Sequence, residues 1–351
     1  MEIVLAIISV LFIFSVILSF IKNDYWVFKI LEYPRLQKLV LILVVGAGWA
    51  LVWPVESTIY KIIIGGLFLS IIYLVHKIWP YTRFAKTEMM RVDDADPENQ
   101  VRIFSANVLQ DNKKYDAMLQ QIRSCDPDIV FLLETNSEWA MAMNQLTKDR
   151  PYTLLAPLEN TYGLLLYSRL KLENPKINFL VKEDIPSVEA VVVLPSGRKF
   201  KIWGLHPEPP VPHESLYATA KDKELMKVAL MAKESMLPCI VFGDLNDVAW
   251  SHTTELFRKT SELLDPRRGR GFYSTFSAHS SFIRYPLDYI FCSPEFGLVA
   301  MKRMPKNGSD HFATYTHLVC NARLKNQQEA PKADKGEIKE AKEKATQKVK
   351  E

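Results

Sequence analysis

The sequence is poor in cysteine, and its central part has no excess of positive charge. The four cysteines, Cys125, Cys239, Cys292 and Cys320, show no CxxC spacing. We find no zinc motif and interpret them as reduced core residues. Residues 98–321 carry 26 Lys and Arg against 26 Asp and Glu, which disfavours a protein that binds nucleic acid mainly through its phosphates. The composition, 48% hydrophobic and 24% charged, also excludes collagen-like, wholly disordered and small disulfide-stabilised chains.

Net positive charge gathers at the C-terminal end instead. Residues 322–351 carry 9 Lys and Arg against 6 Asp and Glu. This stretch has almost no large apolar side chains with which to form a core. We therefore expect a disordered, solvated tail over residues 322–351, with a transient helix as the alternative.

Three long apolar runs occupy the first eighty residues. The first run, Ile3–Ile21, has 19 residues and no charge. The second is Leu39–Trp53. The third, Ile59–Val75, has Lys61 as its only charged residue, and a lysine there can snorkel to the membrane surface. A helix of roughly 20 apolar residues crosses a bilayer. Three runs in succession predict an all-α transmembrane bundle of three helices over residues 1–90, with the lipid bilayer as partner. The alternatives are buried core helices for the two shorter runs and a signal peptide for the first. The signal peptide is disfavoured because a basic n-region and an A-x-A-like cleavage site are missing.

Basic residues around these runs predict an orientation. If the three runs span a membrane, one side of it would carry eight basic residues and the other side only Lys61. The eight are Lys22, Lys29, Arg35, Lys38, Lys77, Arg83, Lys86 and Arg91. The positive-inside rule then places the N-terminus outside and the C-terminal domain in the cytoplasm.

From residue 98 to residue 321, short apolar runs alternate with polar loops. This pattern predicts many strands with interspersed helices, in a layered α/β or α+β domain. The expected strands are Val101–Ala106, Ile129–Leu133, Gly163–Tyr167, Ala190–Leu194, Phe200–Leu205, Cys239–Phe242 and Leu287–Cys292. The expected helices lie around residues 115–122 and at Asp222–Ser235.

Polar residues recur at the ends of these apolar runs. They are Asn107, Glu134, His206, Asp244, Asn246, Asp288, Asp310 and His311. Each alone fits a turn, a helix cap or a structural histidine. Together, at the ends of neighbouring strands, they predict one polar rim. Such a rim can hold a hard cation through Glu134, Asn107 and Asp310, and His311, oriented by Asp288, can contact a phosphate.

The motifs SANVL, LLET, GLLLYSR, GLHPEPP, GDLND, PLDYIF and GSDHF follow one another in this order. By these motifs and their order, the chain resembles the endonuclease/exonuclease/phosphatase superfamily over roughly residues 98–321. The resemblance implies a DNase I-like α/β fold, a four-layer sandwich of two mixed sheets flanked by helices. It also implies Mg²⁺ as cofactor, with Mn²⁺ as the alternative.

The resemblance also implies a role for each residue of the rim. Glu134, Asn107 and Asp310 match the metal-binding positions. Asp244 matches the aspartate that activates the attacking water, and Asn246 the asparagine that stabilises the phosphoryl group. His311 matches the histidine on the scissile phosphate, and Asp288 its orienting carboxylate. His206 matches a histidine of the DNase I and sphingomyelinase branches; abasic-site endonucleases have a tyrosine there, and Leu109 replaces their second acidic residue.

The apolar runs, the HPEPP sequence after His206 and the GRGFYSTF sequence at Gly269–Phe276 resemble the bacterial membrane-anchored branch, which includes teicoplanin-resistance-associated members. This predicts a multi-pass protein of the bacterial plasma membrane. The hypothesis is a Mg²⁺-dependent phosphatase or phosphodiesterase for a lipid-linked phosphate or pyrophosphate, with Asp244 activating water. The alternatives are a nuclease for DNA or RNA and a catalytically inactive membrane interaction module. The branch implies an extracytoplasmic domain, whereas the charge bias implies a cytoplasmic one.

Overall fold

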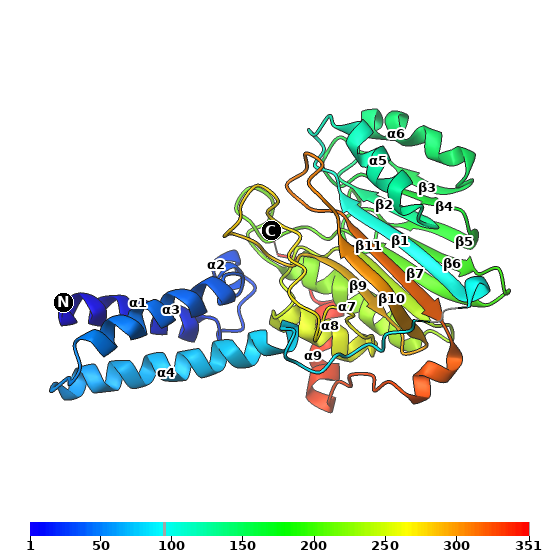
Figure 1. Ribbon diagram of the computed structural model, residues 1–351. Coiled ribbons are helices and arrows are strands. Elements are labelled where there is room, and N and C mark those ends of the chain that lie inside the picture. Colours follow the sequence, from blue (N-terminus) through cyan, green and yellow to red (C-terminus); the bar gives the residue numbers. More distant parts are fainter. Residues whose placement is uncertain (94–95, 351) are drawn as a thin grey trace.

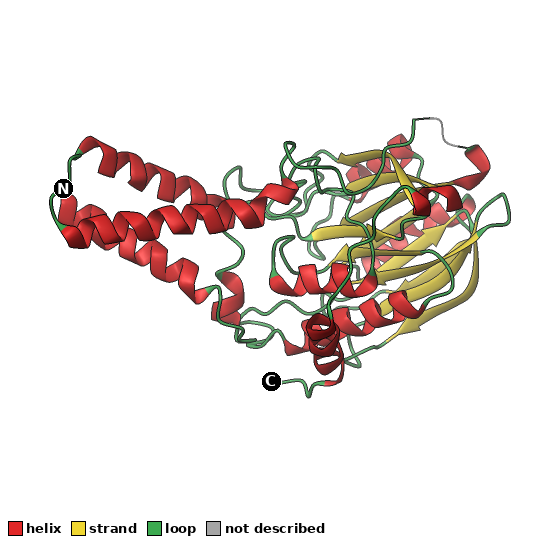
Figure 2. Cartoon of the chain, turned by 90° about the horizontal axis from the view of Figure 1, so that it is seen from below, coloured by secondary structure: helices red, strands yellow, loops and turns green. Residues whose placement is uncertain are grey.

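A bundle of apolar helices projects from one side of an α/β domain in the computed structural model, which describes residues 1–93 and 96–350 (Figures 1 and 2). The bundle contains α1 (Glu2–Leu18), α3 (Arg35–Leu51) and α4 (Thr58–Ile78). A short helix, α2 (Trp26–Ile30), joins α1 to α3, and a 3-10 turn, η1 (Trp79–Tyr81), ends α4. The three predicted apolar runs therefore form three helices.

The outside of the bundle is as apolar as its inside. Buried contacts involve Ile42, Trp49 and Leu74, and the Trp49 Nε1–H group donates to the Ser9 hydroxyl at 3.0 Å. Large apolar side chains also face outwards on each long helix. Among them are Ile3, Leu11, Phe14, Leu43, Val44, Leu51, Ile62, Phe68 and Leu69. A helix that is apolar all round is typical of a large core or a membrane.

The predicted three membrane spans are not supported. In the described part of the chain, only Thr58–Tyr81, with 24 residues, is long and apolar enough to cross a membrane. Helices α1 and α3 have 17 residues each. At about 1.5 Å per residue they are about 25 Å long, shorter than a hydrocarbon core of about 30 Å.

Two mixed sheets form the centre of the α/β domain. The six-stranded sheet has the order β10-β11-β1-β2-β4-β3 and the five-stranded sheet the order β5-β6-β7-β8-β9. The first sheet comprises β1 (Gln100–Asn107), β2 (Ile129–Leu133), β3 (Tyr152–Ala156), β4 (Leu164–Ser168), β10 (Phe296–Arg303) and β11 (Thr314–Cys320). The second comprises β5 (Lys171–Asn178), β6 (Ser187–Val193), β7 (Lys199–Leu205), β8 (Cys239–Asp244) and β9 (Asp288–Cys292).

The sheets pack face to face, and helices cover their outer faces. Between the sheets, the rings of Phe131 (β2) and Phe242 (β8) pack edge to face, with their centroids 5.1 Å apart. Helices α5 (Tyr115–Cys125) and α6 (Ser137–Met143) pack on the six-stranded sheet, and α7 (Thr219–Glu234) and α8 (His252–Ser261) on the five-stranded one. Because β2 and β8 are covered on both faces, β2 is apolar throughout and β8 is apolar up to Asp244, its last residue. The predicted arrangement of two mixed sheets flanked by helices is confirmed.

The C-terminal tail is ordered, contrary to the prediction of a disordered extension. A 3-10 turn, η4 (Ala322–Asn326), precedes helix α9 (Lys335–Thr346). Asp334 and Glu337 form a capping box at the start of α9. Ala341 and Ala345, one turn apart, are buried beside α7 and α8. The Lys344 ammonium lies 2.8 Å from the buried carboxylate of Asp222. Small side chains and a specific ion pair thus replace the large apolar residues that the tail lacks.

Burial of one face of α9 predicts different effects for neighbouring substitutions. Ala341→Asp puts a charge into a fully buried position and should destabilise the protein by roughly 2 kcal/mol. That corresponds to a fall in Tm of about 4 °C. Lys342→Asp, on the exposed face, is the control and should change Tm by less than about 1 °C. Thermal unfolding of the full-length protein in detergent measures both; equal Tm values would contradict the packing of α9.

Candidate active site

Strand pairing brings the predicted polar residues to one edge of the two sheets. In the six-stranded sheet, β1 and β2 are parallel and pair Asn107 with Leu133, so Glu134 follows at the same edge. In the five-stranded sheet, β7 and β8 are parallel and pair Leu205 with Gly243. His206 and Asp244 therefore come next at this edge, and the antiparallel pairing of β8 with β9 sets Asp244 opposite Asp288.

Gly243 allows the close approach of β7 and β8 beside Asp244. Its φ is 130°, and a Cβ atom there would lie 2.1 Å from the carbonyl oxygen of Leu205. Only glycine fits this combination of backbone conformation and space. The G of GDLN is therefore required for the position of the aspartate that follows it.

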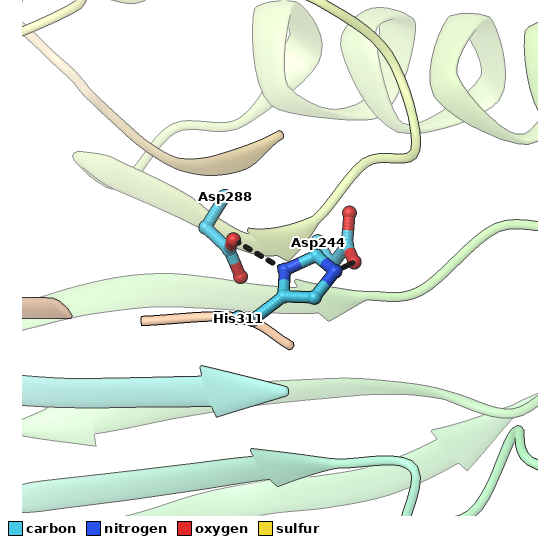
Figure 3. A group of neighbouring side chains, drawn as sticks. All are labelled: Asp244, Asp288 and His311. Atoms are coloured by element: carbon cyan, nitrogen blue, oxygen red, sulfur yellow. Dashed lines mark hydrogen bonds and ion pairs between the residues drawn. The ribbon is translucent and has the colours of Figure 1, made fainter. Parts of the chain in front are cut away.

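His311 lies between two buried carboxylates (Figure 3). Its Nδ1 atom is 2.9 Å from Oδ2 of Asp288, and its Nε2 atom is 3.5 Å from Oδ2 of Asp244. Burial alone would lower the pKa of His311, but Asp288 and Asp244 outweigh it and raise the pKa above its usual value. Burial raises the pKa of Asp244, and the charge of His311 only partly opposes this shift. The three groups can share and move a proton.

Asn107 connects this triad to Glu134. The Asn107 Nδ2 group donates to Oε1 of Glu134 at 2.6 Å and to Oδ2 of Asp244 at 3.3 Å. Burial raises the pKa of Glu134 to about 7, and the negative charge of Asp310 adds to the shift. The carboxylates of Glu134 and Asp310 line the same cavity, and carboxylate and amide oxygens are ligands that fit a divalent cation. Asn107, Glu134 and Asp310 are the residues that would hold it.

A second arrangement can also hold an ion. Ligand atoms of Asp244, Asp288 and His311 all lie within 4.8 Å of one another. However, both ring nitrogens of His311 already face carboxylate oxygens. We therefore interpret this trio as a proton-sharing group, and Asn107, Glu134 and Asp310 as the residues that would hold a cation.

His206 is buried at the same edge and is uncharged at neutral pH. Burial, helped by the charge of His311, lowers the pKa of His206 to about 4. Its Nδ1 atom is buried and finds no hydrogen-bond partner among residues 1–93 and 96–350. Its ring packs against Tyr162, with ring centroids 5.4 Å apart. A neutral imidazole with a free ring nitrogen can bind a substrate oxygen.

Two of these residues have an uncommon backbone conformation. Glu134 has φ 57° and Asn246 has φ 49°, in the left-handed region that is rare for residues other than glycine. Such conformations persist where the surroundings hold them and are enriched at functional sites.

A cavity of about 650 Å³ opens at this edge. Of the eight predicted site residues, six line it: Glu134, His206, Asp244, Asn246, Asp310 and His311. Asn107 and Asp288 do not line it. Asn107 instead bonds to Glu134 and Asp244, and Asp288 to His311. The sequence analysis missed the remaining wall, which contains Tyr33, Tyr162, Glu214, Phe276 and Tyr285. The hydroxyl of Tyr162 donates to Glu214. Tyr162 directly precedes the expected strand Gly163–Tyr167, so the pattern of strand ends could have revealed it. Glu214 lies in the loop between β7 and α7, where that pattern gives no signal.

The sequence model of the endonuclease/exonuclease/phosphatase family matches residues 101–311. That match covers more than half of the chain. The chain belongs to the endonuclease/exonuclease/phosphatase family. Members of this family hydrolyse phosphate esters, and the chain is a phosphoester hydrolase. The membrane-anchored branch that the sequence suggested stays a prediction.

Solved structures of the family share the fold. A family member from Bacteroides thetaiotaomicron is 17% identical, with a TM-score of 0.52 over 63% of this chain and 98% of its own. A member from Bacteroides vulgatus is 16% identical, with a TM-score of 0.51 over 63% and 99%. TDP2 from D. rerio, solved with a single-strand DNA product, is 17% identical, with a TM-score of 0.52 over 62% and 98%. No curated protein matches the chain.

The His311 geometry predicts which substitutions abolish hydrolysis. His311→Gln should lower kcat at least ~100-fold, because the charged ring between Asp288 and Asp244 is lost as a hydrogen-bond donor. Asp288→Asn should lower kcat about 10-fold or more, because the ring loses the charge that favours its protonated form.

The matched control is His317→Gln on β11. The His317 ring bonds to Gln100 at 2.8 Å and does not line the cavity. Steady-state kinetics on a phosphate ester should show unchanged kcat for this control. Normal turnover by His311→Gln would contradict the assignment.

Proposed function

We propose that the protein is a membrane-anchored, divalent-cation-dependent phosphohydrolase for a lipid-linked phosphate or pyrophosphate. One observation carries the proposal: the cavity is lined on one side by the polar rim and on the other by the segment that joins the apolar helices. Ile30, Leu31 and Pro34 come from that segment, between α2 and α3. A phosphate group and an apolar chain can therefore occupy the same cavity.

Further apolar residues complete the second side of the cavity. Pro209, Pro210 and Val211 follow His206 on the loop after β7, and Leu287 precedes β9. Ligand cavities are usually apolar with a few polar groups that fix orientation. Here the polar groups lie together at the sheet edge, so a substrate with one charged end and one apolar end is favoured over a nucleic acid, which is charged along its whole length.

The helical bundle supports membrane anchoring. Its outward side chains are apolar on all three long helices, and an exposed apolar surface of this kind marks a membrane or protein contact. Helix α4, with η1, is the spanning element we propose. Anchoring confines the enzyme and a lipid substrate to one surface, which raises their effective concentration.

The chemistry follows from groups on the rim. Asp244, whose pKa burial raises towards neutral, takes the proton of the attacking water. Asn246 and the neutral His206 bind phosphoryl oxygens, and His311, held by Asp288, donates a hydrogen bond to the scissile phosphate. A divalent cation at Asn107, Glu134 and Asp310 would offset the negative charge of the phosphate. Direct attack by water requires no covalent enzyme intermediate.

The first test of this function compares a lipid-linked substrate with DNA. The full-length protein in detergent with Mg²⁺ should release phosphate from a polyprenyl pyrophosphate, and Asp244→Ala should reduce that rate at least ~100-fold. Supercoiled DNA should not be nicked. DNA nicking that disappears in Asp244→Ala, without lipid turnover, would replace the proposal by a nuclease. Inactivity on all phosphate esters would favour an inactive interaction module.

Leu31 provides a second test, directed at the apolar chain. Leu31→Gln should raise KM for the polyprenyl pyrophosphate about 10-fold, the effect of losing one buried leucine contact. It should leave KM for p-nitrophenyl phosphate unchanged, because that substrate has no chain.

The control for this variant is Leu216→Gln. Leu216 is 40% exposed and does not line the cavity, so neither KM should change. Equal effects of Leu31→Gln on both substrates would contradict an apolar chain at this wall.

A further inference from the structure

The loop that follows Asp244 is held by residues outside the part of the chain that matches the family. This loop, Asn246–Trp250, accepts hydrogen bonds from the helical region at three carbonyl oxygens, and Tyr289 of β9 donates to a fourth, that of Asp247, at 2.8 Å. The Tyr33 hydroxyl donates to Asn246 at 2.8 Å, the Tyr81 hydroxyl to Ala249 at 2.6 Å, and Arg35 Nη1 to Trp250 at 2.5 Å. In return, Trp250 Nε1–H donates to the carbonyl oxygen of Glu32 at 2.9 Å.

These four partners belong to the helical region. Glu32, Tyr33 and Arg35 lie where α2 passes into α3, and Tyr81 lies in η1 at the end of α4. All of them precede residue 101, where the family match begins. The loop is therefore held partly by the family domain and partly by residues that precede the family match.

Asn246 has a φ of 49°, in the left-handed region that asparagine tolerates better than most residues but that is still uncommon. Three hydrogen bonds hold it. Its backbone N–H donates to Oδ1 of Asp244 at 2.9 Å, its side-chain Nδ2 donates to the carbonyl oxygen of Pro207 at 3.0 Å, and its own carbonyl oxygen accepts from Tyr33. Two bonds come from the family domain and the third from the helical region.

Packing and burial both stabilise the hydrogen bond from the Tyr33 hydroxyl to Asn246. The Tyr33 ring packs edge to face on Tyr285, with centroids 5.5 Å apart. Burial, with nearby carboxylates, raises the pKa of Tyr33 well above its usual value, so the hydroxyl keeps its proton. The Asn246 carbonyl therefore has a permanent donor at the cavity wall.

We infer that Tyr33 is a positioning residue for phosphate-ester hydrolysis. It holds Asn246, and through the Asn246 N–H group the carboxylate of Asp244, in the reacting geometry. The helical region is then a working part of the active site as well as an anchor. This inference rests on the proposed roles of Asp244 and Asn246, and it is independent of which phosphate ester is the substrate.

Without the hydroxyl, Asn246 can relax towards commoner backbone conformations. Its side chain and its N–H group would both move, and the bond to Asp244 would weaken. Displacements of about 1 Å in a reacting group can lower a rate by up to about 100-fold. We expect a fall in kcat, with little change in the binding of substrate.

The test uses three Tyr→Phe variants of the full-length protein. Tyr33→Phe removes the bond to Asn246. Tyr81→Phe removes a bond of the same kind to Ala249, farther along the loop, and controls for loss of stability. Tyr25→Phe controls for the substitution itself, since the ring of Tyr25 packs on Tyr217 and its hydroxyl makes no hydrogen bond within residues 1–93 and 96–350. For each variant, kcat and KM on p-nitrophenyl phosphate and bis(p-nitrophenyl) phosphate are measured together with Tm.

Tyr33→Phe should lower kcat about 10-fold and change KM less than twofold. Tyr81→Phe should lower Tm at least as much as Tyr33→Phe, yet change kcat less than twofold. Tyr25→Phe should match the wild type. The same loss of kcat for Tyr33→Phe should appear with a polyprenyl pyrophosphate.

Three results would overturn the inference. Equal losses of kcat in Tyr33→Phe and Tyr81→Phe would show a general effect of stability. A raised KM with unchanged kcat would show that Tyr33 contacts the substrate instead of positioning Asn246. Unchanged kinetics in Tyr33→Phe would show that the bond is dispensable. Failure of the lipid proposal is seen separately, as wild-type activity on aryl phosphates without lipid turnover.

Discussion

The site depends on one buried interaction, the His311 ring between the carboxylates of Asp288 and Asp244. Burying two carboxylates is costly unless each has a charged or hydrogen-bonded partner, and the protonated ring serves both. The pairing of β8 with β9 sets the two aspartates opposite each other, and the chain before β11 brings His311 between them. A shift of one residue in this pairing would turn one carboxylate to the other face of the sheet.

The helical region meets the catalytic edge where α2 passes into α3, and again at η1, where Tyr81 bonds to Ala249. Apolar side chains of this segment line the cavity, and its polar groups hold the loop after Asp244. The proposed membrane anchor is therefore in direct contact with the catalytic edge. Substrate choice and the geometry of the reacting groups would then depend on the same segment.

Much of the domain follows from local sequence. The apolar runs of β2 and β8 are evident because both faces of these strands are covered, and the polar residues at strand ends mark one edge. Strand β5 is less evident, since it contains Pro175, charged residues and an irregular register with β6. The order of α9 depends on Asp222, far away in the sequence. The role of Tyr33 depends on a contact with Asn246 that no motif encodes. Such contacts arise only from the tertiary fold.

Photo-crosslinking can test directly whether one cavity holds both the phosphate, at the polar rim, and the apolar chain, at the segment between α2 and α3. The probe is a non-hydrolysable polyprenyl phosphonate with a diazirine on the first unit of its chain. It is bound to the full-length protein in proteoliposomes and irradiated, and the modified peptides are identified by mass spectrometry. We expect modification within residues 30–34 and 209–211, and we expect competing polyprenyl pyrophosphate to reduce it. Modification confined to the outer faces of α1, α3 and α4 would contradict it.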